Sequence, residues 1–417
     1  MLHCNCLRHL VCASALVLSL SLCAQVKPGI EVLVESGFSG LEGKKVALLT
    51  NPSGVDRCLR STIDILFEAP QVDLVRLFGP EHGVRGDGYA GDHVKDGIDK
   101  ATGLKVYSLY GEYRQPTDEM LDGIDVVVYD IQDVGTRSYT FISSLGLMMR
   151  SCAKLGIEVM VLDRPNPLGG LKVEGSYVED GYYSFVSQYR IPYIYGLTVG
   201  ELAQLINEEG LNRGQKGNLA PAHCSLTVVP MEGWARWMRY ADTGLPWVAP
   251  SPNIPYPDTA ICYPCSGLCG ECPDYLNIGV GYTLPFATFA ASWIDAEALK
   301  KRLESYGLEG VAFRTVHYKP FWGSCAGKMQ HGVQYYFTDY EKAGLTLLQF
   351  YVMQAVRELY PDKNPFATGK YEMFDKVCGT DYVRTVFKER YKVADILRFW
   401  TKDISDFRTL SRNYYIY

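Results

Sequence analysis

The sequence predicts an α/β protein built on a parallel sheet, followed by a smaller α+β domain. Short runs of Val, Ile and Leu alternate with helical segments in the first half of the chain, which is typical of parallel strands buried on both faces. Four of these runs end in turns that carry charged or amide side chains. At 417 residues the chain is long enough for two domains, each with its own core.

The elements of the first domain follow from where the apolar runs begin and stop. We expect strands at 44–50, 72–78, 105–109, 124–129 and 158–162. We expect helices at 61–68, from residue 116, at 140–155 and at 198–209. Thr198 and Glu201 form a capping box at the start of the last helix, and Gly156 ends the one before it.

A proline-dense stretch at 244–255 cannot form regular structure and predicts the junction between the two domains. The same stretch is a candidate lining of a crevice at the carboxyl ends of the strands. We therefore expect one domain at 25–254 and a second at 255–417. The second is expected to contain strands at 311–316 and 332–337, a helix at 345–360 and a helical tail.

The first 24 residues have the features of a signal peptide. Arg8 precedes an apolar stretch at 10–22, and a small-residue cleavage site lies after Ala24. The alternative is a lipoprotein, with Cys23 as the lipidated residue. Either reading predicts export to the periplasm or the extracellular space. No other stretch is long and apolar enough for a stable membrane span.

The charge pattern argues against nucleic acid as a partner. The formal net charge is -6, and no run rich in Lys and Arg occurs. The oligomeric state is left open.

Four cysteines lie close together in a CxxC-x3-CxxC pattern: Cys262, Cys265, Cys269 and Cys272. Thiolates at this spacing could hold zinc. In an exported protein, disulfides within a loop or free thiols are the favoured alternative.

Polar residues follow the ends of four expected strands. Crossovers between parallel strands are right-handed, so all the carboxyl ends lie at one edge of the sheet. The side chains expected to meet there are Asn51, Glu81, His82, Asp130, Asp133, Arg137, Asp163, Arg164 and Asn166. The turn at 79–86 is the most informative, because it places a carboxylate, an imidazole and the guanidinium of Arg85 among glycines and a proline.

Two carboxylates facing each other across a crevice suit glycoside hydrolysis. We expect Glu81 to act as general acid, oriented by His82, with Asp130 or Asp133 as base or nucleophile. The arginines Arg85, Arg137 and Arg164 are expected to bind an anionic group, and Tyr139 offers a flat surface to a sugar ring.

Two alternatives belong to other classes. Metal-assisted hydrolysis would use Glu81, His82, His93, Asp130 or Asp163, but no HxH or HExxH spacing supports a metal. A module that binds cell-wall fragments without cleaving them is the second. No GxGxxG follows the first strand, so no dinucleotide cofactor is expected.

Several ordered motifs resemble one family, the NamZ-type exo-β-N-acetylmuramidases. They are FGPEHGVRG at 78–86, VYSLYG at 106–111, DIQDVG at 130–135, LDRPNPLGG at 162–170, VEG at 173–175, GLTVGE at 196–201 and PSPN at 250–253. The resemblance covers essentially the whole mature chain. It implies a Rossmann-like first domain, no cofactor, and release of terminal N-acetylmuramic acid from the non-reducing ends of peptidoglycan fragments.

The resemblance also adds Glu174 and Asn253 to the expected substrate-binding residues. A muramic substrate accounts for the arginines, because its lactyl ether carries a carboxylate unless a peptide is attached. The acetamido oxygen of the substrate becomes an alternative to Asp130 and Asp133. One region departs from the family: a TNLSEGRGT-like segment is replaced by the cysteine cluster and by YLNIGVGY at 275–282. The preferred aglycone or hexosamine is therefore left open, with Glu271 in the place of a family glutamate.

Overall fold

The computed structural model describes residues 26–86 and 96–417. The expected signal peptide, the lipoprotein cysteine Cys23 and the segment at 87–93 with His93 lie outside the described residues. None of the described helices has the length and apolar character needed to cross a membrane.

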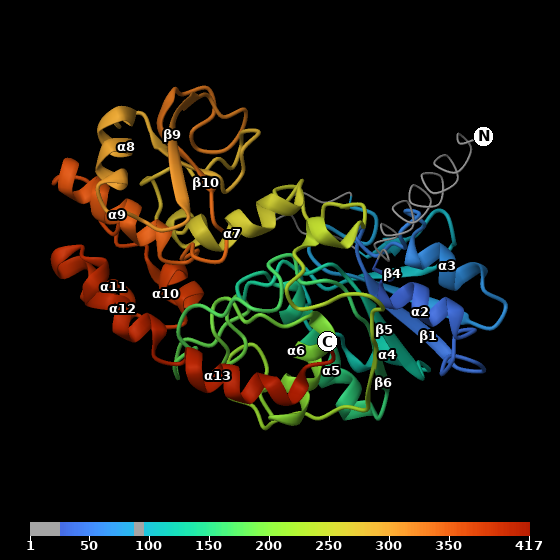
Figure 1. The fold of residues 1–417 in the computed structure, drawn as a ribbon. Coiled ribbons are helices and arrows are strands. Elements are labelled where there is room, and N and C mark those ends of the chain that lie inside the picture. The colour runs from blue at the N-terminus through green and yellow to red at the C-terminus, as the bar shows by residue number, and fades with distance from the viewer. Residues whose placement is uncertain (1–25, 87–95) are drawn as a thin grey trace, which may run out of the picture.

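The first domain is organised around a seven-stranded sheet (Figure 1). Its strands are β1 (Lys45–Thr50), β2 (Asp73–Gly79), β3 (Gly97–Ile98), β4 (Lys105–Ser108), β5 (Val126–Asp130), β6 (Glu158–Leu162) and β7 (Leu226–Val229). The order is β3-β4-β2-β1-β5-β6-β7, and all pairs are parallel except β3 with β4. This confirms the expected α/β fold with a parallel sheet.

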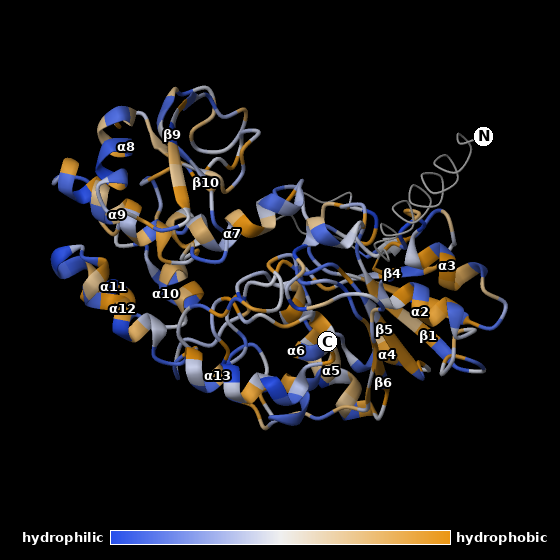
Figure 2. Ribbon diagram, in the orientation of Figure 1, coloured by the Kyte–Doolittle hydropathy of each residue, from blue (hydrophilic) through white to orange (hydrophobic). Residues whose placement is uncertain are grey.

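Helices cover both faces of this sheet, as the apolar strands require. On one face lie α2 (Gly29–Glu35) and α3 (Thr62–Glu68), and on the other α4 (Asp118–Leu121), α5 (Phe141–Leu155) and α6 (Val199–Glu208). Alternate residues of β1 enter the two cores: Val46 and Leu48 pack with the first pair of helices, Ala47 and Leu49 with the others. The strands are accordingly apolar along their length (Figure 2).

The strand order places a crevice at the carboxyl ends of β1 and β5. The chain moves from β1 to β2 and β4 on one side, then returns to β5 on the other side of β1. In open α/β sheets, ligands bind outside the carboxyl ends of the strands where the order reverses in this way. Thr50 and Asp130, the last residues of β1 and β5, are register partners, so the turns after both strands lie side by side.

The second domain is a three-stranded antiparallel sheet packed with helices. The strands β8 (Thr288–Ala291), β9 (Val311–Tyr318) and β10 (Gln330–Phe337) have the order β8-β10-β9. The helices are α8 (Ala296–Glu304), α9 (Leu348–Leu359), α10 (Glu372–Cys378), α11 (Tyr382–Arg390) and α12 (Val393–Thr401). Helix α7 (Pro257–Gly270) runs between the two sheets, and α13 (Ile404–Ser411) returns to the first domain (Figure 1).

The end of the chain is bound tightly to the first domain. Phe407 of α13 and Tyr414 belong to the core beneath α5 and α6. The hydroxyl of Tyr417 donates to Asp163 Oδ2 at 2.8 Å and accepts from the backbone N–H of Met231 at 2.7 Å. The last residues of the sequence therefore cover the end of β6.

The four clustered cysteines lie on α7 and at its end, and not in a loop. Their spacing of three, four and three residues is that of one face of a helix. All four are buried free thiols in the core of the second domain. Among the described residues, no group of three or more His, Cys, Asp or Glu side chains is placed to hold a metal ion. The expected loop is thus corrected: the pattern reflects a helix packing against a core.

Candidate active site

The turn after β2 holds Glu81 and His82 in a tight loop. The backbone N–H of Gly83 donates to the carbonyl of Pro80 at 3.0 Å, which closes a four-residue turn with Glu81 and His82 at its centre. His82 has φ of 75°, in the left-handed region that glycine usually occupies. Its backbone is therefore strained, and strain of this kind is found at functional sites. His82 is also buried. The half-buried side chain of Glu81 is carried on this turn.

The charge of Glu81 acts on tyrosines from three other segments. Tyr110 follows β4, and burial together with the charge of Glu81 raises the pKa of its hydroxyl to about 12. Tyr139 precedes α5 and Tyr263 lies on α7; burial raises the pKa of both hydroxyls, and Glu81 adds to it. The rings of Tyr139 and Tyr263 meet edge to face at 5.6 Å. Glu81 is therefore placed among aromatic side chains from both sides of the crevice.

Asp133 is the second carboxylate of this group. Its Oδ2 accepts hydrogen bonds from the backbone N–H of Gly135 at 2.8 Å and from the hydroxyl of Tyr195. Its Oδ1 has no hydrogen-bond partner within the described residues. Burial raises the pKa of Asp133 to about 6, and its charge acts on Tyr139 and Tyr263, the same tyrosines that Glu81 influences. Glu81 and Asp133 thus act on the same pair of tyrosines.

Asp130 is placed differently, although it is only three residues away. It is fully buried, and the guanidinium of Arg164 binds both of its oxygens, with Nη2 to Oδ2 at 2.8 Å. Oδ2 also accepts from the hydroxyl of Thr62. Arg164 Nη2 further donates to the carbonyl of Val55 at 2.7 Å. These two residues form a buried ion pair that ties the ends of β5 and β6 together, which corrects the expectation that Asp130 faces the substrate.

The other two expected anion-binding arginines are also engaged within the protein. Arg137 is fully buried and uses all five N–H donors. They bind the hydroxyl of Ser187 and four backbone carbonyls: Ser176, Ile191, Val377 and Cys378. Arg85 donates to Asp99 at 2.9 Å and 3.1 Å and to Asp64 at 3.0 Å. The structure leaves Arg137 no donor for a substrate and gives Arg85 two carboxylate partners instead.

Three further expected residues hold the loops around the crevice. Asn51 donates to the carbonyl of Pro250 at 3.0 Å, which fixes the proline-dense stretch against the end of β1. Asn166 donates to the carbonyl of Leu197 at 2.9 Å. Glu174 accepts from the backbone N–H groups of residues 345 and 346 in the second domain. Their observed contacts are structural, because each is satisfied by the protein itself.

A pocket of about 360 Å³ continues the site into the second domain. Tyr263 belongs both to its wall and to the tyrosines around Glu81. Among the residues that line the pocket are Asn253, Glu271, Leu276, Asn277, Ile278 and Trp322. Asn253, which the sequence predicted to bind substrate, lines this pocket. Burial raises the pKa of Glu271, and the pocket wall contains no Lys or Arg among the described residues.

Residues of this pocket come from segments that sequence reasoning did not assign to the site. Trp322 lies after β9, and Leu276 and Ile278 follow the cysteine helix. These positions carry no acid or base, so nothing in their residue types marked them. The only sequence signal was the departure from the family pattern at 275–282.

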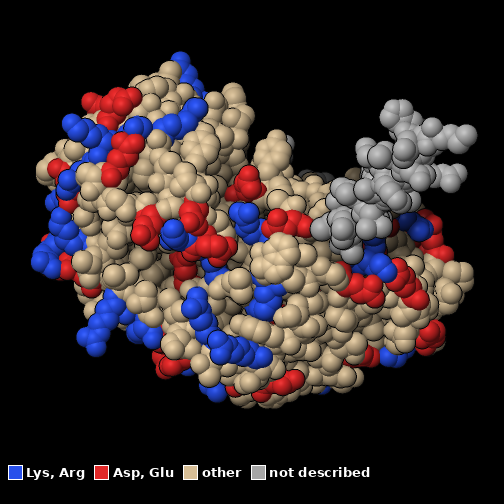
Figure 3. All heavy atoms as spheres, viewed as in Figure 1, with Lys and Arg blue, Asp and Glu red and all other residues tan. Residues whose placement is uncertain are grey.

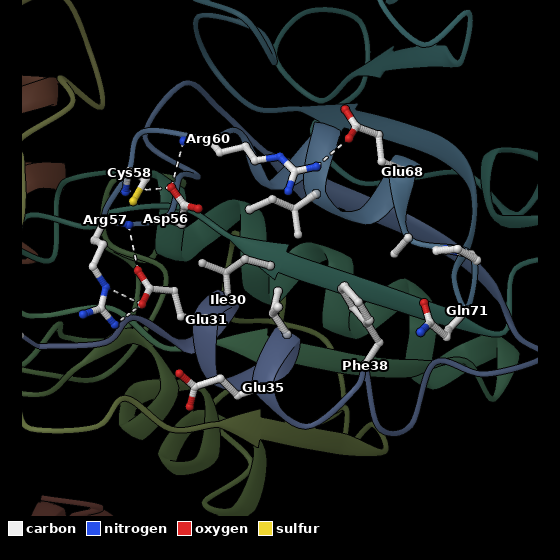
Figure 4. Close-up of a pocket in the computed structure, with 14 residues that line it drawn as sticks. Ile30, Glu31, Glu35, Phe38, Asp56, Arg57, Cys58, Arg60, Glu68 and Gln71 are labelled. Carbon is white, nitrogen blue, oxygen red and sulfur yellow. Dashed lines mark hydrogen bonds and ion pairs between the residues drawn. The ribbon is translucent and has the colours of Figure 1, made fainter.

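A second hollow, of about 510 Å³, lies between α2 and α3 (Figure 4). Both of its arginines are paired with carboxylates of the same hollow: Arg57 with Glu31, and Arg60 with Glu68 at 2.6 Å. We therefore place the chemistry at the crevice. On the face shown in Figure 3, acidic and basic side chains are interspersed.

Family models decide the relationship that the motifs indicated. Residues 46–258 match the N-terminal part, and residues 261–417 the C-terminal part, of the exo-β-N-acetylmuramidase NamZ. The chain belongs to the NamZ family. The two family models meet in the first turn of α7.

Members of the NamZ family resemble this chain over nearly its whole length. The peptidoglycan β-N-acetylmuramidase NamZ of Bacillus subtilis (strain 168) is 41% identical over 394 residues, which is 94% of this chain and 92% of that protein. Two solved structures of DUF1343 family proteins from Bacteroides fragilis NCTC 9343 each cover 94% of this chain and 99% of their own. One is 52% identical with a TM-score of 0.89, and the other 26% identical with a TM-score of 0.74.

Proposed function

We propose that this NamZ family protein is an exo-acting glycoside hydrolase that releases N-acetylmuramic acid from the non-reducing ends of peptidoglycan fragments. Family membership over both domains supports the reaction class, and the relative from B. subtilis is a peptidoglycan β-N-acetylmuramidase. The observation that carries the proposal for this chain is the pair Glu81 and Asp133, gathered with tyrosines at the carboxyl edge of the sheet.

In this proposal Glu81 is the general acid that protonates the glycosidic oxygen of the leaving group. Glu81 is half-buried, and its charge acts on the hydroxyl of Tyr110. His82 lies next to it in the same strained turn and orients it. Asp133 serves as base or nucleophile, or supports attack by the acetamido oxygen of the substrate. Tyr139 and Tyr263 present their rings to the sugar.

The protein is proposed to act outside the cytoplasm. The leader-like sequence at 1–24 supports export to the periplasm or the cell exterior. An exported exo-hydrolase of this kind would shorten cell-wall fragments for recycling. Mass spectrometry of the N-terminal peptide of the protein from culture distinguishes cleavage after Ala24 from lipidation at Cys23.

Turnover of two muramides tests the reaction. The protein is expected to hydrolyse 4-nitrophenyl N-acetyl-β-muramide and a muramyl–glucosamine disaccharide. Glu81→Gln is expected to lower kcat for the disaccharide by about 10²–10⁴-fold, the usual contribution of a general acid. The variant should still bind N-acetylmuramic acid, measured by calorimetry. Unchanged turnover by Glu81→Gln would remove Glu81 from the mechanism. Binding without turnover by the wild-type protein would instead support a cell-wall-binding module.

A further inference from the structure

One arginine at the edge of the crevice is not used by the fold. Arg114 lies in the segment between β4 and α4 and is exposed. Its guanidinium carbon is 4.3 Å from the ring centroid of Phe185 and 5.5 Å from that of Tyr110. Within residues 26–86 and 96–417, its side chain makes no hydrogen bond or ion pair. Arg85, Arg137 and Arg164 contrast with it, because each is bound to carboxylates or carbonyls.

The position of Arg114 relates it directly to the candidate acid. Tyr110 interacts with both: the negative charge of Glu81 raises the pKa of its hydroxyl, and the guanidinium of Arg114 lies 5.5 Å from its ring centroid. A guanidinium held against two aromatic rings keeps its N–H donors at its edges, free for a planar acceptor. Stacking also reduces the conformational freedom that binding would otherwise remove. Arg114 is therefore prepared for a carboxylate that arrives beside Glu81.

The pocket at the other end of the site, beyond Tyr263, carries the carboxylate of Glu271 and no positive charge among the described residues. An anionic group entering that pocket would meet a carboxylate and no counter-ion. A neutral sugar could instead use Asn253, Asn277 and the ring of Trp322. The charge distribution thus orients a substrate that carries one carboxylate.

We propose that Arg114 binds the free carboxylate of the lactyl ether on the terminal muramyl residue, with the neutral aglycone directed toward the Glu271 pocket. This inference rests on the proposed function and adds a specificity determinant to it. The lactyl group is the feature that distinguishes N-acetylmuramic acid from N-acetylglucosamine, and a bidentate arginine–carboxylate contact reads it. Arg114 is thus the residue that makes the enzyme prefer muramides to glucosaminides.

The kinetic test compares both sugars in Arg114→Gln. We expect kcat/KM for 4-nitrophenyl N-acetyl-β-muramide to fall 10- to 100-fold, chiefly through KM, while the value for the matched glucosaminide changes less than twofold. Arg114→Lys should give an intermediate loss, because it keeps the charge but not the fork of donors. The matched control is Arg190→Gln, since Arg190 is an exposed arginine stacked on Tyr177 at 4.5 Å in a separate hollow.

A binding measurement separates this inference from the proposed function. In the Glu81→Gln background, calorimetry would compare N-acetylmuramic acid, its lactyl methyl ester and N-acetylglucosamine. Adding Arg114→Gln is expected to weaken binding of the acid at least tenfold and to leave the two neutral ligands unchanged. Equal loss for all three ligands, or no loss for the acid, would overturn the assignment of Arg114. If the wild-type protein does not turn over the muramide but binds N-acetylmuramic acid in a way that depends on Arg114, the hydrolase proposal alone is overturned.

Discussion

Glu81 and Asp133 act on the same two tyrosines but have different surroundings. Glu81 is half-buried on a turn that the chain holds under strain at His82. Asp133 is almost completely buried, with one oxygen held by Tyr195 and Gly135 and the other unpaired within the described residues. Because of these different surroundings we propose different roles for the two carboxyl groups.

The pKa of Asp133 predicts the acidic limb of the pH profile. Its value of about 6 means that the carboxyl group takes up a proton as the pH falls through 6. If the ionised form is required, kcat/KM falls about tenfold per pH unit below that point. Asp133→Asn should lower the activity at all pH values and remove this limb. The measurement is kcat/KM for the aryl muramide from pH 4 to 8.

Asp163→Asn is the matched control for that profile. Burial raises the pKa of Asp163 to about 6 as well, but its oxygens are taken by Thr198, Gly200, Arg164 and Tyr417. The acidic limb should persist in this variant. If Asp163→Asn removes the limb and Asp133→Asn retains it, Asp133 is not the titrating group.

At the scale of elements, the sequence predicted the parallel sheet because its signals are local. The strands β1, β2, β4, β5 and β6 are apolar runs that end at turn residues, and each was placed within about two residues. Helix α7 was missed, because Pro264 and four cysteines at 262–272 resemble a loop motif when the partner surface is unknown. Strand β7 was missed as well: it is short and only partly buried, so its pattern is weak.

The capping box of α6 yields a stability prediction. The hydroxyl of Thr198 accepts from the backbone N–H of Glu201 at 3.2 Å and donates to Asp163 Oδ2 at 2.7 Å. Thr198→Ala removes the cap and leaves a buried carboxylate oxygen with one donor fewer, so we expect a loss of about 2 kcal/mol. Urea unfolding measures it. Thr409→Ala, on an exposed position of α13, is the control and should change little. An equal midpoint for both variants would contradict this account of the cap.

At the scale of the whole molecule, buried polar side chains join the two domains. Arg137 reaches the carbonyls of Val377 and Cys378 at the end of α10, and Glu174 binds the backbone just before α9. These partners lie more than 170 residues away in sequence. A sequence does not show which residues pair over such separations. Polar residues at strand ends that hold the fold could therefore not be distinguished from those that face a substrate. Their division into Glu81 and Asp133 on one side, and Arg137, Arg164 and Asp130 on the other, needed the structure.

Arg137→Met tests whether this arginine joins the domains. The substitution leaves four buried carbonyls and one hydroxyl without their donor, and we expect the free energy of unfolding to fall by about 3–5 kcal/mol. Urea unfolding followed by tryptophan fluorescence gives the value. The ratio of KM values for the two aryl glycosides should stay unchanged at a temperature where the variant is folded. A stable variant with a raised KM for the muramide alone would return Arg137 to substrate binding.

The most direct test of the central claim, that Glu81 is the general acid, is the dependence of its loss on the leaving group. A general acid matters most when the departing oxygen is basic and little when it is a stable phenolate. We expect Glu81→Gln to lower kcat/KM for a muramyl–glucosamine disaccharide at least tenfold more than for an activated dinitrophenyl muramide. An equal loss on both substrates would contradict the claim and assign Glu81 to binding or structure.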